Sequence, residues 1–210
     1  MNMDSQLEAV RLLLPVKAFD RAKSRLALPD RQRTRVARLL FAHTLGISLQ
    51  CLTPRQVVVM TSDPVARKLA ARRGVKSLSD PSDDLNTSLE AVLHVLRKCF
   101  PASTLAVTVS DLPGLTAPIL YRALRESSRS SHPAVVVDQH GTGTTFLSIP
   151  PKGRLPMHFG RNSARKFTEA GAVPLLFPPP GITHDLDVLS DLHPSFAIHQ
   201  EDLCPSTSSP

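Results

Sequence analysis

The sequence alternates short apolar runs with amphipathic stretches almost from end to end, and this alternation restricts the possible folds more than any other feature. Runs typical of buried strands are followed by segments whose apolar residues recur at helical spacing. The pattern predicts an α/β domain in which right-handed crossovers join a mostly parallel central sheet to flanking helices. We predict strands at 11–16, 57–61, 75–78, 104–110, 134–138, 144–149 and 173–177.

Helices are predicted between these strands, where residues typical of helix starts and ends flank segments with apolar residues at helical spacing. Thr87-Ser88-Leu89-Glu90 matches the capping box, in which side chains of the first turn bind otherwise unpaired backbone N–H groups. Gly74 and Gly171 each follow a helical stretch and indicate where it ends. The expected helices span 30–49, 63–73, 87–100, 116–126 and 162–170.

Length and composition fit one globular domain. At 210 residues we expect a single domain over 1–203 and a disordered tail over 204–210. No run reaches the ~20 apolar residues that span a bilayer, so we expect no membrane partner and a cytoplasmic location. The net charge of +7 favours anionic partners. Nucleic acid is a weaker candidate than a polyphosphate substrate, because helix-turn-helix, zinc-finger and RNA-recognition patterns are absent.

The loop after the first predicted strand is basic. It reads PVKAFDRAKSRL and carries Lys17, Lys23 and Arg25. Ligands of such sheets bind at the carboxyl ends of the strands, where three cations could neutralise a triphosphate. A solvated basic loop is the alternative. P-loop, HExxH and GxSxG motifs are absent, which removes several common enzyme classes.

Three aspartates lie where a metal site is expected. Asp111 directly follows the apolar strand at 104–110, and Pro113 stiffens the turn that holds it. Asp185 and Asp187 flank Leu186, so in extended chain the two carboxylates point to the same side. Paired carboxylates favour a cation between them, and Mg²⁺ prefers hard oxygen ligands. A turn-capping Asp and a solvent-facing edge strand are the alternatives.

Two glycine-bearing segments could hold an anion. His140-Gly141-Thr142-Gly143-Thr144-Thr145 and Phe159-Gly160-Arg161-Asn162-Ser163 combine glycine with hydroxyl side chains. Glycine lets backbone N–H groups approach an anion closely, and a helix start near Ser163 would add further donors. A glycine turn and an ordinary helix cap are the alternatives.

Together these motifs resemble the 2-phospho-L-lactate or phosphoenolpyruvate guanylyltransferases, which act in biosynthesis of the deazaflavin coenzyme F-420. PVKAFDRAKSRLA, DDLNTSLEAV, SDLPGLT, HGTGTTFLSIPP, FGRNSARKF and HDLDVLSDL occur in the order of that family, from about residue 13 to 192. The resemblance implies a nucleotidyltransferase fold of the glycosyltransferase-A type, which is Rossmann-like. It also implies transfer of GMP from GTP to a phosphorylated three-carbon acid with release of pyrophosphate.

The resemblance assigns a role to each matching position. It implies that Mg²⁺ is held by three carboxylates, those of Asp111, Asp185 and Asp187. These aspartates and Lys17 are the expected catalytic residues.

The resemblance also assigns both substrates. It places the acid on Thr145, Gly160 and Ser163. The residues expected to bind the nucleotide are Lys17, Lys23, Arg25 and Asn86.

The chain departs from the family pattern at three places. Asp84 replaces a glycine before Leu85-Asn86, Val188-Leu189 replaces Thr-Pro, and Thr145-Phe146 replaces Asn-Ala. The acid stays open among phosphoenolpyruvate, 2-phospho-L-lactate and 3-phosphoglycerate, although an arginine-rich composition, as in GC-rich actinobacteria, favours phosphoenolpyruvate. Nucleotidyltransferases of the molybdenum-cofactor or sugar type are the nearest rivals, and a basic nucleic-acid-binding domain is a more distant one.

Overall fold

The computed structural model describes residues 7–22, 28–176 and 178–186. They form one seven-stranded sheet of order β3-β2-β1-β4-β6-β5-β7. β6 runs antiparallel to its neighbours β4 and β5, whereas the other neighbouring strands are parallel. The mostly parallel sheet is thus confirmed. The strands are β1 (Val10–Pro15), β2 (Val57–Met60), β3 (Lys76–Leu78), β4 (Thr104–Thr108), β5 (Ala134–Val137), β6 (Thr144–Ile149) and β7 (Val173–Pro174).

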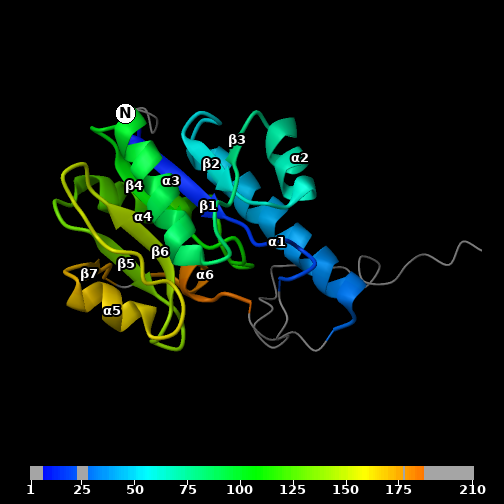
Figure 1. Ribbon diagram of the computed structural model, residues 1–210. Helices are drawn as coiled ribbons and strands as arrows, with labels where there is room; N and C mark the ends of the chain where they lie inside the picture. The colour runs from blue at the N-terminus through cyan, green and yellow to red at the C-terminus, as the bar shows by residue number, and fades with distance from the viewer. Residues whose placement is uncertain (1–6, 23–27, 177, 187–210) are drawn as a thin grey trace, which may run out of the picture.

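Helices cover both faces of the sheet and complete a three-layer α/β fold (Figure 1). The helices are α1 (Asp30–Cys51), α2 (Pro64–Arg72), α3 (Leu85–Cys99), α4 (Ala117–Arg129), α5 (Ser163–Glu169) and α6 (Pro180–Thr183). α1, α2, α4 and α6 contribute to the core on one face, and α3 and α5 to the core on the other. None of the described helices is both long enough and apolar enough to cross a membrane.

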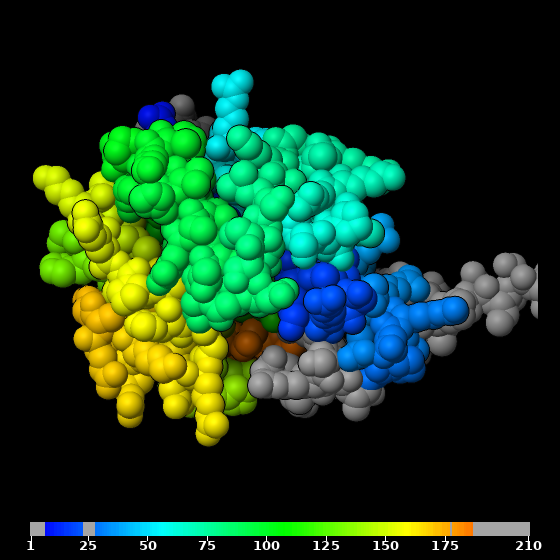
Figure 2. All heavy atoms as spheres, viewed as in Figure 1, coloured from blue at the N-terminus to red at the C-terminus, as the bar shows by residue number. Residues whose placement is uncertain are grey.

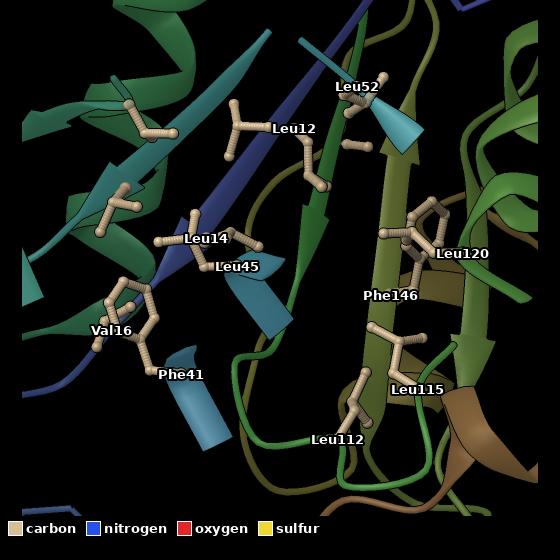
Figure 3. Packing of buried hydrophobic residues seen from close by; sticks show 14 of the residues in the cluster. Leu12, Leu14, Val16, Phe41, Leu45, Leu52, Leu112, Leu115, Leu120 and Phe146 are labelled. Carbon is tan, nitrogen blue, oxygen red and sulfur yellow. The ribbon is translucent and has the colours of Figure 1, made fainter. Parts of the chain in front are cut away.

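β1 forms the centre of both cores. Leu12, Leu13 and Leu14 are all 0% exposed. Because side chains alternate along a strand, Leu12 and Leu14 enter one core while Leu13 enters the other. Figure 3 shows the first of these cores, where Leu14 lies near Leu45 of α1. Full burial of each such side chain stabilises the fold by about 1.5–3 kcal/mol.

The reversed direction of β6 gathers the candidate residues at one edge. The carboxyl ends of the parallel strands β1, β2, β3 and β4 meet there, and the amino end of the antiparallel strand β6 lies at the same edge. The segments after β1 and β4 therefore lie near the GTGT segment that precedes β6.

Several predicted boundaries need correction. The proposed capping box at Thr87 is wrong, because α3 begins at Leu85 and Asp84 is its N-cap. Aspartate caps helices more strongly than threonine, and the Asp84 carboxylate accepts a hydrogen bond from the Thr87 backbone N–H. This bond lowers the pKa of Asp84. The short helix α6 escaped prediction, and the expected tail over 204–210 lies outside the described residues.

His43 of α1 holds the turn that follows β4. Its Nε2 lies 2.9 Å from the carbonyl oxygen of Leu115, so Nε2 carries the donated hydrogen in the neutral ring. Burial lowers the pKa of His43 below 6.5, and the hydrogen bond to Leu115 opposes this effect only partly. The unfolded chain therefore binds a proton at His43 more readily than the folded chain does, and stability declines as pH falls below about 6.5.

We predict that His43→Gln flattens this part of the pH dependence. Glutamine can still donate an amide N–H to Leu115 but does not titrate. The melting temperature of the variant should fall less than that of the wild type between about pH 7.5 and pH 5, the range over which histidine titrates. Parallel thermal melts of both proteins across this range provide the test. Identical losses in both would contradict the assignment to His43.

Candidate active site

A cleft of about 440 Å³ opens at the sheet edge just described. Its apolar wall includes Val16, directly after β1, and Ala37 and Leu40 of α1. Its polar side chains include a cation and several carboxylates. They are Lys17, Asp80, Asp83, Ser110, Asp111 and Asp185. In Figure 2 the last described residues, in brown, lie in a hollow bordered by the blue segment after β1 and the green α3.

A second cleft of about 380 Å³ adjoins the first and shares Lys17, Asp80 and Asp83 with it. Arg21 and Ser82 extend its lining. The shared residues make one continuous polar trough, to which the loop after β1 contributes cations and the segments after β3, β4 and α6 contribute carboxylates. Lys17 and Arg21 suit an anionic group such as a polyphosphate.

Asp63 fixes the loop that carries Lys17. The Asp63 carboxylate is buried and accepts hydrogen bonds from the backbone N–H groups of Phe19, Val65 and Ala66. The latter two bonds cap α2, while the bond from Phe19, 2.9 Å long, reaches across from the loop after β1. One side chain therefore orders both the start of α2 and the backbone two residues after Lys17. The predicted ligands Lys23 and Arg25 lie outside the described residues.

The structure brings Asp111 and Asp185 to the same cleft. The Leu186 backbone N–H donates to the carbonyl oxygen of Asp111 at 3.0 Å, which places the two chain segments side by side. Leu186, the residue after Asp185, is fully buried and anchors this segment in the core. Asp187 lies outside the described residues, so the structure does not test the full triad.

The donor set suits a hard divalent cation. Two carboxylates that face one cleft repel each other, and Mg²⁺ relieves this repulsion through oxygen coordination. Among residues 7–22, 28–176 and 178–186, no three His, Cys, Asp or Glu side chains form a cluster able to hold a metal. Asp111 and Asp185 alone could supply only part of a coordination shell, and their role as metal ligands stays a prediction.

Residues 10–172 match the family described as "Guanylyl transferase CofC like". The chain belongs to this family. The phosphoenolpyruvate guanylyltransferase of Mycolicibacterium gilvum is 34% identical over 190 residues, which cover 87% of each chain. The enzyme of the same name from Streptomyces coelicolor is 34% identical over 191 residues, 89% of this chain and 90% of that one.

Solved structures confirm the nucleotidyltransferase fold. A nucleotide-diphospho-sugar transferase from Desulfovibrio desulfuricans is similar with a TM-score of 0.59 at 15% identity, over 80% of this chain and 79% of that one. A 4-diphosphocytidyl-2C-methyl-D-erythritol synthase gives a TM-score of 0.57 at 12% identity, over 87% and 95% of the two chains. At these identities the likeness concerns the fold alone. The family match and the relatives named phosphoenolpyruvate guanylyltransferase identify this chain as a nucleotidyltransferase.

Thr145 links the two segments that carry the acidic residues of this guanylyl transferase. It is 1% exposed, and its hydroxyl donates to the carbonyl oxygen of Ile182 at 2.6 Å. Its own carbonyl oxygen accepts from the Val109 backbone N–H at 3.0 Å. Val109 lies two residues before Asp111, and Ile182 lies three before Asp185. Thr145 thus helps to set the separation of these carboxylates, and its contact with an acid substrate stays a prediction.

Gly160 and Ser163 form one turn before α5. Gly160 adopts a φ of +112°, which favours glycine, and open space surrounds the position where a Cβ would lie. The Ser163 hydroxyl is buried and donates to Thr144 Oγ1 at 3.1 Å, which joins the turn to β6. Within the described chain, Thr145, Gly160 and Ser163 all lie outside the linings of the two clefts. Their role with the acid stays a prediction.

The motif analysis missed three residues of the trough. Arg21 lies in the predicted basic loop but received no role, although it lines the second cleft. Asp80 and Asp83 line both clefts. The signal for Asp80 was its place two residues after the parallel strand β3, because the carboxyl ends of parallel strands share one edge.

Gly181 lets α6 approach the turn after β4. A Cβ at this position would lie 2.1 Å from the carbonyl oxygen of Gly114 and 2.8 Å from Ile119 Cδ1. Backbone atoms cannot move aside as a flexible side chain can, so α6 and the attached Asp185 depend on glycine here.

We predict that Gly181→Ala destabilises the protein by about 1–3 kcal/mol, because it overpacks a close backbone contact. Chemical denaturation should show a lower midpoint with an unchanged slope. Shortening the Ile119 side chain in the same variant should restore little of the lost stability, because the clash with the Gly114 backbone carbonyl would remain. A midpoint equal to that of the wild type would show that α6 does not need this close approach.

Proposed function

We propose that the chain transfers the guanylyl group of GTP to phosphoenolpyruvate and releases pyrophosphate, as a step of coenzyme F-420 biosynthesis in the cytoplasm. The observation that carries the proposal is the convergence of Lys17, Asp111 and Asp185 on one cleft in a member of a guanylyl transferase family. The choice of phosphoenolpyruvate rests on the names of relatives that share 34% of their residues with this chain.

The proposed reaction needs no protein nucleophile. An oxygen of the acid's phosphate attacks the α-phosphorus of GTP, a new P–O bond forms, and the bond to the β-phosphate breaks. The attacking oxygen is already anionic at neutral pH, so no residue has to remove a proton. The barrier lies in bringing two anions together, which makes positioning and charge neutralisation the main tasks of the protein.

The residues of the trough match these tasks. Lys17 and Arg21 would bind phosphate oxygens of GTP, aided by Lys23 and Arg25 from the same segment. Asp111 and Asp185 would hold Mg²⁺ together with Asp187. When bound, the metal supplies charge neutralisation at the phosphates. Thr145 at the start of β6, together with Gly160 and Ser163 near the start of α5, would orient the acid.

The proposal predicts that pyrophosphate release requires GTP, Mg²⁺ and phosphoenolpyruvate together. Purified protein should be assayed with GTP, ATP or CTP, with Mg²⁺ or a chelator, and with each of several acceptors. Phosphoenolpyruvate, 2-phospho-L-lactate, 3-phosphoglycerate and a sugar phosphate form the acceptor set. Release at the same rate without an acid, or with the sugar phosphate, would refute the proposed reaction.

Asp111→Asn and Asp185→Asn should each lower kcat by at least about a hundredfold, the usual scale for loss of one electrostatic group at a reacting phosphate. Removal of one of two neighbouring charges relaxes their repulsion, so both variants should stay folded. Asp20→Asn is the matched control, because Asp20 is an exposed carboxylate outside the described linings of both clefts. Circular dichroism checks folding. Near-normal turnover at saturating Mg²⁺ would show that the acids are structural.

A further inference from the structure

The amide of Asn86 forms two hydrogen bonds with the backbone of a single distant residue. Its Nδ2 donates to the carbonyl oxygen of Phe159 at 3.0 Å, and its Oδ1 accepts from the Phe159 N–H at 2.7 Å. The N–H can only donate and the carbonyl can only accept, so this pairing fixes the orientation of the amide. Asn86 thus pairs with Phe159 much as a neighbouring strand would.

Glu90 adds a third hydrogen bond from the same helix. Its Oε1 accepts from the Met157 backbone N–H at 3.1 Å. Asn86 and Glu90 are four residues apart on α3 and therefore project from the same face of the helix. The segment at 157–159 is thus held along α3 through alternate residues, which is the spacing at which extended backbone presents its N–H groups to one side.

The segment held by α3 leads directly into the turn at 160–163. On its other side, the Phe159 ring packs edge-on against Phe167 of α5, with 5.3 Å between ring centroids. The Ala164 backbone N–H donates to the Thr142 carbonyl oxygen at 3.2 Å and ties the turn to the GTGT segment. The position of the turn is thus set from three directions, and Asn86 provides the contact with α3.

The same end of α3 borders the nucleotide side of the site. Asp83 and Leu85 line the first cleft, and Asp84 caps the helix. Asn86 is the next residue after Leu85. At the start of α3, Leu85 therefore lines the cleft, while Asn86 holds the segment that leads into the turn at 160–163.

We propose that Asn86 is a positioning residue for the acid-binding turn and is not a ligand of the nucleotide. This inference rests on the proposed function and replaces the nucleotide role that the sequence resemblance gave to Asn86. A nucleotide could bind the amide only if both bonds to Phe159 broke. That would leave a partly buried N–H and carbonyl group unpaired, which is unfavourable.

The test compares Asn86→Ala and Asn86→Leu with Thr87→Ala. Both Asn86 variants remove the two bonds, and leucine keeps most of the side-chain volume. Alanine and leucine favour helix more than asparagine does, so α3 itself should not weaken. Thr87→Ala changes the adjacent residue, whose hydroxyl bonds to Asp84, and leaves the backbone cap intact.

Two measurements decide the outcome. Hydrogen exchange at the Phe159 amide should be faster in both Asn86 variants than in the wild type and in Thr87→Ala. The Michaelis constant for phosphoenolpyruvate should rise about tenfold, or ~1.4 kcal/mol, while the dissociation constant for GTP from calorimetry stays within about twofold. Asn86→Asp keeps an acceptor for Phe159 N–H but sets an oxygen against the Phe159 carbonyl. Its Michaelis constant for phosphoenolpyruvate should rise as in the alanine variant, with less change in exchange at Phe159.

Unchanged exchange at Phe159, or GTP binding weakened as much as use of the acid, would overturn the inference. A Michaelis constant unchanged alongside faster exchange would also overturn it, because the contact would then be purely structural. Failure of the proposed function is a separate result. Wild-type protein that releases no pyrophosphate with any phosphorylated acid would refute the reaction, while exchange at Phe159 would still report on the contact.

Discussion

The candidate active site depends on holding the segments of Asp111 and Asp185 side by side although the two carboxylates repel each other. The structure achieves this with neutral groups: Leu186 N–H binds the Asp111 carbonyl, and the Thr145 hydroxyl binds the Ile182 carbonyl. Gly181 permits the close approach of α6 that both bonds need. Because backbone geometry sets the separation, the carboxylates themselves are left to face the cleft. A cation bound between them would relieve their repulsion, and Mg²⁺ at this place stays a prediction.

The reversed strand β6 adds a further segment to the edge at which the clefts open. A purely parallel sheet places only the loops after its strands at the ligand edge. The reversal brings the start of β6, with Thr144 and Thr145, to the edge where β1 and β4 end. Thr145 can therefore bond to residues near both acids. The backbone near Lys17, fixed by the buried carboxylate of Asp63, brings Lys17 and Arg21 to the trough.

The sequence was sufficient to predict the strand–helix order and the meeting of Lys17 and Asp111 at one sheet edge, because these depend on local periodicity and on a general rule for parallel sheets. The meeting of Asp185 with them was implied only by the family resemblance, because Asp185 follows α6 and not a parallel strand. The sequence was not sufficient for contacts made by polar side chains across long separations. Thr87-Ser88-Leu89-Glu90 satisfies the capping-box pattern, yet Asp84 caps the helix and Glu90 binds Met157. No local pattern indicates a partner 67 residues away. Asp187, Lys23 and Arg25 lie outside the described residues and stay predictions.

The helix α3 combines both kinds of feature: an apolar periodicity that the sequence reveals, and long-range polar contacts that it does not. Its apolar face, including Leu89 and Leu96, packs in the core beneath the sheet and fixes the helix axis. A helix anchored in this way can hold an irregular segment through side chains, because its backbone is already ordered and only side-chain freedom is lost on making the contacts. From this fixed helix, Asn86 and Glu90 form the hydrogen bonds to the backbone of 157–159 that a neighbouring strand would otherwise form. The turn at 160–163 can then keep the open space around Gly160 while its backbone remains fixed on both sides.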